Sequence, residues 1–267
     1  MSEERRIALL LEYDGAAFAG SQWQPNARTV QEVLESALLQ FTGEGAGGLD
    51  GDEPRRRVSF AGRTDSGVHA SGQVAALSTK TQHSPATCRD ALNHFLPEDV
   101  VVRAATEVPV SFDPRRYAVG RRYRYRLEDG RGRVPLTRRI AWQLERSLDH
   151  SAMAAAMALL PRTERDWAAF SGLVPDGYST VRTLLDACVE RCAPGVVQVD
   201  VEATGFLPHQ VRLMIGALER VGSGRLGPGE FAALVDGAPA SAGPAAPPQG
   251  LTLMAVRYPP GLIDWER

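Results

Sequence analysis

Strand and helix patterns follow one another in the same order twice along this chain of 267 residues. Each half has the apolar spacing of a strand, a helix, further strands, a second helix and a last strand. That order is typical of a ferredoxin-like α+β unit, which RNA-recognition modules also use. We therefore predict an α+β fold of two ferredoxin/RRM-like halves, residues 1–110 and 111–267. They are expected to form one long, mostly antiparallel sheet with helices on one face.

In the first half, Thr29 and Glu32 stand at capping-box spacing, ahead of apolar residues with helical period. They predict an amphipathic helix over residues 29–43. Ser84 and Pro85 are typical of a helix start, and this second helix is expected to end near residue 95. Strands are expected over residues 6–15, 58–62, 72–80 and 99–108. The Gly- and acid-rich segment 43–57 is predicted to be a mobile loop.

In the second half, residues 121–129 alternate strictly between apolar and charged side chains. The alternation predicts a strand with Tyr123, Tyr125 and Leu127 on one face and arginines on the other. A strand pair about an Ala-Pro-Gly turn is expected within residues 183–206. Helices are expected over residues 151–161 and 209–224 and from Pro228 onward, and a last strand over residues 250–259, after a Pro-rich loop at 237–249.

Composition excludes several classes of protein. The chain is 43% hydrophobic, which is ordinary for a globular protein, and no apolar run reaches the length of a membrane span. The first residues lack the pattern of a signal peptide, so a cytoplasmic location is expected. Cys188 and Cys192 would lie roughly 13 Å apart on one strand, too far for a disulfide. We expect all three cysteines to be reduced and structural.

The charge distribution leaves room for an RNA ligand. The net charge of −2 argues against a generic nucleic-acid binder. Residues 115–139, however, contain ten arginines against two acids, Glu128 and Asp129. Coding bias explains why only Lys80 is a lysine, yet arginine still offers a planar fork for phosphates and for base stacking. One strongly basic segment can bind RNA on an otherwise acidic protein.

The segment AGRTDSGVH, residues 61–69, has the residue types of a reactive turn. Its Asp65 is expected between two strands, where rigid elements can direct it into a cleft. The alternative is that Asp65 makes an Asx turn while Arg63 faces water. A metal site is not expected, because one Asp and one His four residues apart do not make a set of ligands.

Three other kinds of residue bear on this turn. Arg212, early in a predicted helix, could keep an aspartate ionised, or it could pair with Glu219 or face solvent. Tyr123 and Tyr125 could stack a base while the neighbouring arginines hold phosphates, or they could be core residues. His69 and His209 flank the two motifs, and we expect both to be structural hydrogen-bonding residues.

Eight sequence blocks together resemble the tRNA pseudouridine synthase A family, and GRTDSGVHA is highly specific to it. The blocks lie at residues 20–24, 29–35, 60–74, 112–127, 165–172, 179–185, 205–224 and 246–258. The resemblance implies a pseudouridine synthase fold and a cofactor-free isomerase. Its substrate would be uridine in the tRNA anticodon stem-loop, at position 38, 39 or 40. It implies Asp65 as nucleophile and leaves open whether the aspartate attacks the base, attacks the sugar or promotes a glycal route.

The same resemblance implies roles for three further residues. Tyr123 matches the tyrosine that stacks on the target uracil, and Arg212 matches the basic residue paired with the nucleophile. Arg63 matches the arginine that helps take the base out of the stack. The family implies a homodimer in which one tRNA contacts both subunits. Ser21 departs from the pattern, because the family has an aromatic there; Pro208, Gln210 and Thr252 also depart from it.

Two rival functions are considered. An RNA-binding protein of this fold without activity would be expected to lack the aspartate or the stacking tyrosine, and this chain has both. A metal-dependent hydrolase using Asp65 and His69 would need further carboxylate or histidine ligands and would be sensitive to chelators. Neither rival accounts for all eight blocks.

Overall fold

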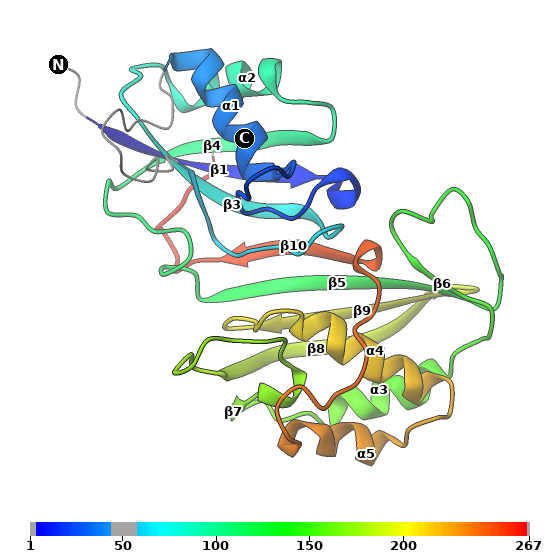
Figure 1. The fold of residues 1–267 in the computed structure, drawn as a ribbon. Helices are drawn as coiled ribbons and strands as arrows, with labels where there is room; N and C mark the ends of the chain where they lie inside the picture. The colour runs from blue at the N-terminus through cyan, green and yellow to red at the C-terminus, as the bar shows by residue number, and fades with distance from the viewer. Residues whose placement is uncertain (1–3, 44–57, 266–267) are drawn as a thin grey trace. The chain divides into compact units, whose positions relative to one another are not determined.

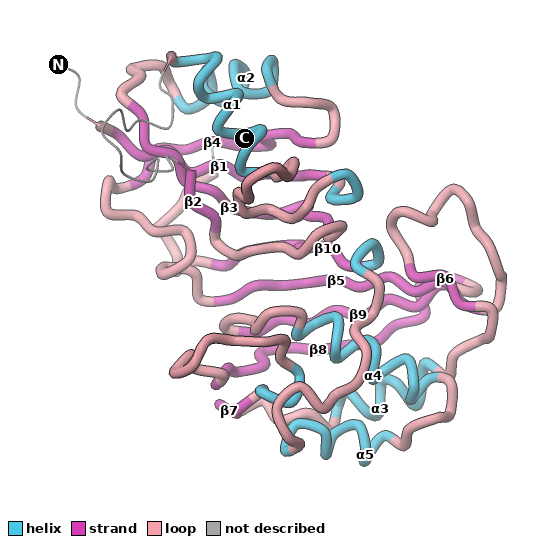
Figure 2. The backbone as a smooth tube through the Cα atoms, in the orientation of Figure 1, coloured by secondary structure: helices cyan, strands magenta, loops and turns pink. Residues whose placement is uncertain are grey.

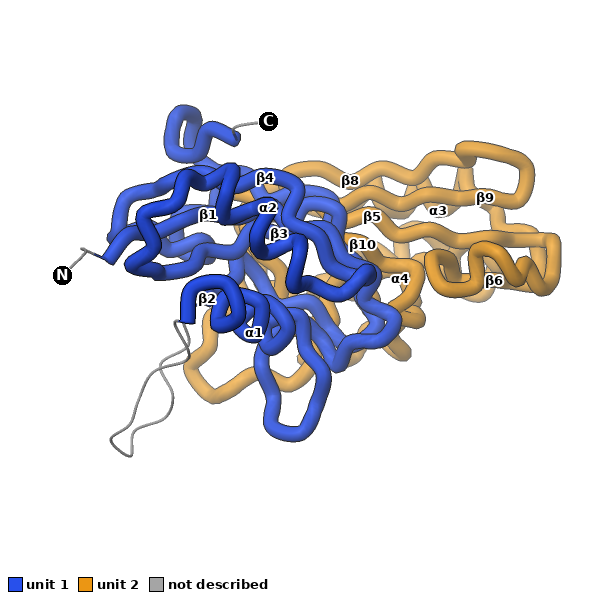
Figure 3. Tube along the Cα trace, turned by 90° about the horizontal axis from the view of Figure 1, so that it is seen from above, with its two compact units in different colours: residues 1–119, 253–267 blue, residues 120–252 orange. Residues whose placement is uncertain are grey.

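The computed structural model describes residues 4–43 and 58–265 (Figure 1). The chain forms two compact units, Met1–Val119 with Leu253–Arg267, and Gly120–Thr252 (Figure 3). The last strand, β10 (Leu251–Arg257), begins in the second unit and continues into the first. The sequence-based division into residues 1–110 and 111–267 stays a prediction.

Unit 1 is built around β1 (Arg5–Tyr13), whose apolar residues Ile7, Leu9 and Leu11 are fully buried. This strand pairs antiparallel with β3 (His69–Thr79) on one side and with β4 (Val100–Val108) on the other. The strand order is β4-β1-β3-β10, with the short β2 (Val58–Phe60) also on β3 (Figure 2). Two helices, α1 (Val30–Thr42) and α2 (Pro85–Phe95), pack against each other, and α2 packs against β4.

The helices of unit 1 begin where the capping residues predict. The Thr29 hydroxyl accepts the Glu32 amide at 3.2 Å, and the Glu32 carboxylate accepts the Thr29 amide at 3.2 Å. This reciprocal pair satisfies amides that the first helical turn leaves without partners. Gly43 then ends α1 in the left-handed region, with φ at 70°. The predicted loop at 43–57 lies, after Gly43, outside the described residues.

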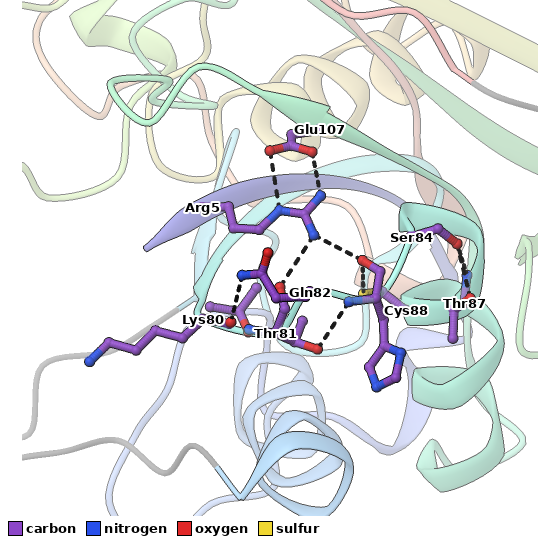
Figure 4. A network of polar contacts seen from close by, with 10 residues as sticks. Arg5, Lys80, Thr81, Gln82, Ser84, Thr87, Cys88 and Glu107 are labelled. Atoms are coloured by element: carbon purple, nitrogen blue, oxygen red, sulfur yellow. Dashed lines mark hydrogen bonds and ion pairs between the residues drawn. The ribbon is translucent and has the colours of Figure 1, made fainter. Parts of the chain in front are cut away.

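One arginine ties the start of β1 to two neighbouring segments (Figure 4). The Arg5 guanidinium forms a two-pronged ion pair with Glu107 on β4. It also donates to the carbonyl oxygens of Thr81 at 3.2 Å and His83 at 2.9 Å, in the connection from β3 to α2. The guanidinium thereby joins three segments that are far apart in the sequence.

Unit 2 has the strand order β5-β9-β8-β7, and all of these pairs are antiparallel. The short β6 pairs with β5 in parallel. Helix α3 packs against β8, and the three helices of this unit pack against one another. The strands are β5 (Gly120–Asp129), β6 (Trp142–Leu144), β7 (Glu164–Asp166), β8 (Val181–Ala193) and β9 (Val196–Ala203). The helices are α3 (His150–Ala158), α4 (Gln210–Gly222) and α5 (Pro228–Ala233).

Four short 3-10 turns complete the described elements: η1 (Gly15–Ala17), η2 (Ala168–Phe170), η3 (Leu234–Asp236) and η4 (Pro248–Gly250).

The predicted α+β class and the predicted helices are confirmed. The three cysteines are free, as expected, although Cys192 is exposed and therefore has no core role. No helix among the described residues is long and apolar enough to cross a membrane. The described ranges also contain no group of three or more metal-ligating side chains.

Strand β3 begins at His69, three residues before the predicted start, because Gly72 does not interrupt it. A Cβ at Gly72 would lie 2.1 Å from the Met254 carbonyl oxygen on β10. The glycine is therefore what lets these two strands approach each other. Its lack of a side chain marks a close backbone contact rather than the end of a strand.

Candidate active site

The turn that carries Asp65 joins β2 to β3. The Val68 amide donates to the Asp65 carbonyl at 3.1 Å and closes a four-residue turn. Gly67, its third residue, has φ of 78°, which glycine adopts without steric cost. Asp65 is half-buried, whereas Arg63 and Ser66 are exposed. The turn thus places the carboxylate at the margin of the unit 1 core.

Thr64, the residue before Asp65, is held by two buried partners. Its amide donates to Ser21 Oγ at 2.9 Å, and the Ser21 amide donates to the Thr64 carbonyl at 3.1 Å. The Thr64 hydroxyl lies 2.8 Å from the Tyr13 hydroxyl. Ser21 is 0% exposed and Thr64 is 5% exposed, so water does not compete for these bonds. The backbone that leads into Asp65 is therefore fixed.

The glycines around the turn are held as well. Gln73 Nε2 on β3 donates to the Gly62 carbonyl at 2.9 Å. A Cβ at Gly20 would lie 2.8 Å from the Thr64 carbonyl, so the 18–21 segment lies directly against the turn.

Burial raises the pKa of Tyr13 to about 12, partly offset by its hydrogen bonds with Thr64 and Gln73. The Tyr13 hydroxyl therefore stays neutral at physiological pH and acts as a structural group.

His69 is buried at the start of β3 and has a structural contact. Its Nδ1 accepts the Gly15 amide at 3.1 Å. The same nitrogen lies 3.1 Å from Asp14 Oδ1. The expectation that His69 is a hydrogen-bonding residue is confirmed.

The two tyrosines of β5 differ although they share a face. Tyr125 is fully buried, and its hydroxyl donates to the Pro247 carbonyl at 2.7 Å. Burial raises the pKa of this phenol, and the charge of Arg212 lowers it only in part. Tyr125 is therefore the more deeply buried of the two. Tyr123 is 8% exposed and packs edge-on against Phe206, with ring centroids 5.2 Å apart.

Arg122, Arg124 and Arg126 of β5 lie on the other face, as predicted, but acids already neutralise them. Arg121 instead shares the tyrosine face, and its guanidinium donates to the Thr204 carbonyl at 2.8 Å. Arg124 binds Asp200 with two hydrogen bonds of 2.8 and 2.9 Å, and Arg122 binds it at 3.1 Å. Burial raises the pKa of Asp200, yet the two arginines outweigh this and hold it below its usual range. Arg126 pairs with Glu128. The expectation that these strand arginines hold phosphates is not supported by their contacts.

The connection between β5 and β6 is a long loop (Figure 1) that contains four exposed arginines. Its exposed arginines are Arg131, Arg133, Arg138 and Arg139. None of these four arginines takes part in the β5 ion pairs with Asp200 and Glu128.

Arg212 lies in the first turn of α4 and is half-buried. Its Nε donates to the Ala246 carbonyl at 2.8 Å. Glu219, the alternative partner of Arg212, binds Arg225 instead. His209 precedes this helix in the left-handed region, with φ of 61°, and its carbonyl accepts the Leu213 amide at 2.9 Å. The alternative in which Arg212 pairs with Glu219 is wrong.

Comparison with known proteins shows to which family this chain belongs. Residues 10–116 and 164–259 match the profile of a family described as tRNA pseudouridine synthase. The tRNA pseudouridine synthase A of Roseiflexus castenholzii is 48% identical over 258 residues, which cover 96% of this chain and 91% of that protein. This chain belongs to the tRNA pseudouridine synthase A family. The proteins of the same name from Chloroflexus aurantiacus and Geobacter sulfurreducens are 43% identical over 265 residues and 42% identical over 257 residues. These alignments cover 98% and 95% of this chain, and 91% and 100% of the two relatives.

The candidate residues of this synthase-family chain fall in both units. Arg63 and Asp65 share one turn of unit 1, whereas Tyr123 and Arg212 belong to unit 2 and both border the connection between β9 and α4. Arg63, Asp65 and Arg212 lie inside the segments that match the family profile, and Tyr123 lies between those segments.

Sequence analysis missed the residues that hold the turn of this family member. Tyr13 and Ser21 contact the turn through buried hydrogen bonds, and Gln73 contacts it through a partly buried one. Gln73 did carry a signal, because a glutamine inside an apolar strand needs buried partners. Tyr13 carried none, and Ser21 was noticed only as a departure from the family pattern, since their partner Thr64 is more than forty positions away.

Proposed function

We propose that this member of the tRNA pseudouridine synthase A family converts uridine to pseudouridine in the tRNA anticodon stem-loop. The target is position 38, 39 or 40, and Asp65 is the nucleophile. The observation that carries the proposal is the fixed turn around Asp65, in which buried hydrogen bonds immobilise Thr64 from Ser21 and Tyr13. A nucleophile that is placed before substrate arrives needs no reorganisation in the transition state.

The reaction is a rearrangement within one nucleotide. The N1–C1′ bond breaks, the uracil rotates while it stays bound, and C5 forms the new bond to C1′. The C5 proton leaves and N1 gains a proton, so no electrons are exchanged with a partner. We therefore propose that no cofactor takes part. This balance is consistent with all three routes: attack by Asp65 on the base, attack by Asp65 on the sugar, and a glycal route that Asp65 promotes.

Three side chains complete the proposed machinery. A uridine within a stem-loop must leave its stack before the base can be attacked. Arg63, exposed beside Asp65, is proposed to promote that step. Tyr123 is proposed to stack on the extruded uracil, since aromatic rings bind bases of any sequence through their faces. Arg212 is proposed to keep Asp65 ionised, because a nearby cation favours the charged carboxylate.

We further propose that the enzyme works in the cytoplasm as a homodimer in which one tRNA contacts both subunits. The exposed arginines of the β5–β6 connection, together with Arg115 and Arg116, are suited to the phosphates of such a substrate. The acidic net charge does not oppose this, because local charge governs contact with the RNA backbone.

The test maps the product on a tRNA. An unmodified tRNA transcript with uridines at positions 38, 39 and 40 is incubated with the protein in EDTA. Pseudouridine is then located by carbodiimide adducts that stop reverse transcription. New stops at one or more of these positions are expected. Modification elsewhere in the tRNA would overturn the proposed target, and no modification of a tRNA that the protein binds would overturn the activity.

A further inference from the structure

Arg212 is held by a reciprocal pair of hydrogen bonds. Its Nε donates to the Ala246 carbonyl at 2.8 Å, and the Ala246 amide donates to the Arg212 carbonyl at 2.8 Å. Backbone and side chain of the arginine are thus bound to the same residue. The direction of the guanidinium therefore depends on where Ala246 lies.

The segment around Ala246 lies directly on α4. A Cβ at Gly216, one helical turn beyond Arg212, would be 2.1 Å from the Pro244 carbonyl. Ala242 and Ala246 are buried. Prolines at 244, 247 and 248 restrict the backbone, because each ring fixes φ and removes an amide donor. The segment is stiff, and it needs other partners for its carbonyl groups.

Tyr125 supplies one of those partners from the core of unit 2. Its hydroxyl donates to the Pro247 carbonyl at 2.7 Å. Its ring lies against the end of the segment, since a Cβ at Gly250 would be 2.6 Å from Tyr125 Cε1. Trp142 packs edge-on against the ring, at 6.4 Å between centroids. Two consecutive carbonyls, of Ala246 and Pro247, are thus bound by Arg212 and by Tyr125.

We infer that Tyr125 is a positioning residue for Arg212 and acts through the segment 244–250. The inference rests on the proposed function, because it gives Arg212 a role in the reaction. Without the Tyr125 hydroxyl, the Pro247 carbonyl loses its donor and the segment can shift on α4. Ala246 then moves, and the Arg212 guanidinium moves with it. The rate of the chemical step then falls, while the surface that binds tRNA is unchanged.

The test is Tyr125→Phe, which keeps the ring and removes the hydroxyl. We expect kcat to fall by about 10-fold or more, since a displacement of about 1 Å in a catalytic group can cost about 100-fold in rate. KM for tRNA is expected to stay within about twofold, as it does when an interaction made only in the transition state is lost.

A matched control comes from unit 1. The Tyr258 hydroxyl also donates to a proline carbonyl, that of Pro114, at 2.7 Å. Tyr258→Phe therefore removes the same kind of bond in the unit that does not contain Arg212. Both variants are expected to lower the melting temperature by similar amounts. Only Tyr125→Phe is expected to lower kcat.

The route through Arg212 has its own test in a double-mutant cycle. In an Arg212→Lys background the Nε contact with Ala246 is already lost, so Tyr125→Phe is expected to change kcat by less than twofold. A full, multiplied loss in the double variant would overturn the inference. If Tyr125→Phe has no cooperative melt, Gly250→Ala replaces it, because the added methyl crowds the ring from the segment side.

The outcomes separate the two proposals. Equal kcat in wild type, Tyr125→Phe and Tyr258→Phe would overturn the positioning role and leave the proposed function intact. Equal losses in both variants would also overturn it, because the effect would then be one of general stability. A wild-type protein that makes no pseudouridine would overturn the proposed function and the inference with it.

Discussion

Ser21 and Thr64 are joined by two hydrogen bonds that run in opposite directions. The Ser21 amide donates to the Thr64 carbonyl at 3.1 Å, and the Thr64 amide donates to Ser21 Oγ at 2.9 Å. The second bond requires a short side chain with an acceptor, which an aromatic residue at position 21 would not provide. Because Thr64 directly precedes Asp65, this pair controls the backbone that carries the proposed nucleophile.

Ser21→Ala removes the acceptor and leaves the buried Thr64 amide without that partner. A buried polar group that loses its hydrogen bond costs about 1–3 kcal/mol, and we expect a loss of that size in urea unfolding. We also expect kcat to fall more than the affinity for tRNA.

Ser66→Ala is the control for this substitution. It lies in the same turn and is exposed, and its hydroxyl donates to the Phe18 carbonyl at 3.2 Å. A small change in stability and turnover is expected, because water can replace the lost donor. Equal effects of the two substitutions would contradict the special role of the Ser21–Thr64 pair.

The second prediction concerns Tyr123. Tyr123→Phe keeps the ring against Phe206, so tRNA affinity is expected to stay within about twofold. If the hydroxyl assists proton loss from C5, kcat is expected to fall on the order of 10- to 100-fold. Tyr123→Ala removes the ring, and tRNA binding is expected to weaken by about 1–3 kcal/mol, the value of one stacked base. Binding titrations and single-turnover rates measure the two effects. Undiminished affinity in Tyr123→Ala would contradict stacking.

Local signals predicted the elements well, and contacts between distant residues decided the details. The Thr29–Glu32 capping box marked the start of α1, and strict alternation marked β5, because both signals act over a few residues. Strands β6 and β7 were missed, since each has only three residues and, unlike the equally short β2, neither leads directly into a recognised motif. The two tyrosines of β5 could not be separated, because alternation places them on the same face.

What distinguishes those tyrosines is a carbonyl far along the chain. Tyr125 is bound to Pro247, 122 positions away, and no local pattern reports such a contact. For the same reason, no local pattern predicted the hydrogen bonds that hold the Asp65 turn. Tyr13 and Ser21 reach Thr64 only once β1 and β3 have paired. The catalytic candidates were visible because they form a motif, whereas the residues that position them are scattered.

The third prediction concerns a buried ion pair in unit 2. Asp129 has a fully buried carboxylate that accepts two hydrogen bonds from Arg191, both 2.9 Å, and one from the Leu148 amide at 2.6 Å. The Arg191 hydrogen bonds hold the pKa of Asp129 below its usual range. The folded pKa is thus lower than the unfolded one. The stability from this pair is therefore complete above the unfolded value, about 3.9, and is lost as the pH falls below it.

Arg191→Met leaves the Asp129 carboxylate buried without its cation, and we expect a loss of about 3–5 kcal/mol at pH 7. The acid dependence of unfolding should also become shallower below about pH 4, because Asp129 then gains less from being ionised. Urea unfolding at several pH values measures both effects. The exposed pair Arg165–Asp236 is the control, and Arg165→Met should change stability by no more than about 1 kcal/mol. A similar loss in both variants would contradict the role given to burial.

The fourth prediction separates two roles for His209. Its φ of 61° lies in the left-handed region, which costs most side chains about 1–2 kcal/mol relative to glycine. His209→Gly should therefore be more stable than His209→Ala by about 1 kcal/mol in thermal unfolding. Turnover of His209→Gly should match wild type if the residue only begins α4. A large fall in kcat with intact tRNA binding would instead show that the imidazole takes part in the reaction.

The central claim is that Asp65 performs the chemistry on a flipped uridine, and proton release from C5 reports that chemistry directly. We would measure tritium release from tRNA carrying [5-³H]uridine, with wild type, Asp65→Ala and Asp65→Asn side by side in EDTA. Release by wild type alone, with tRNA affinity and circular dichroism unchanged in both variants, is the predicted result. Release by the variants at the wild-type rate would contradict the account, as would a wild-type protein that binds the tRNA and releases none.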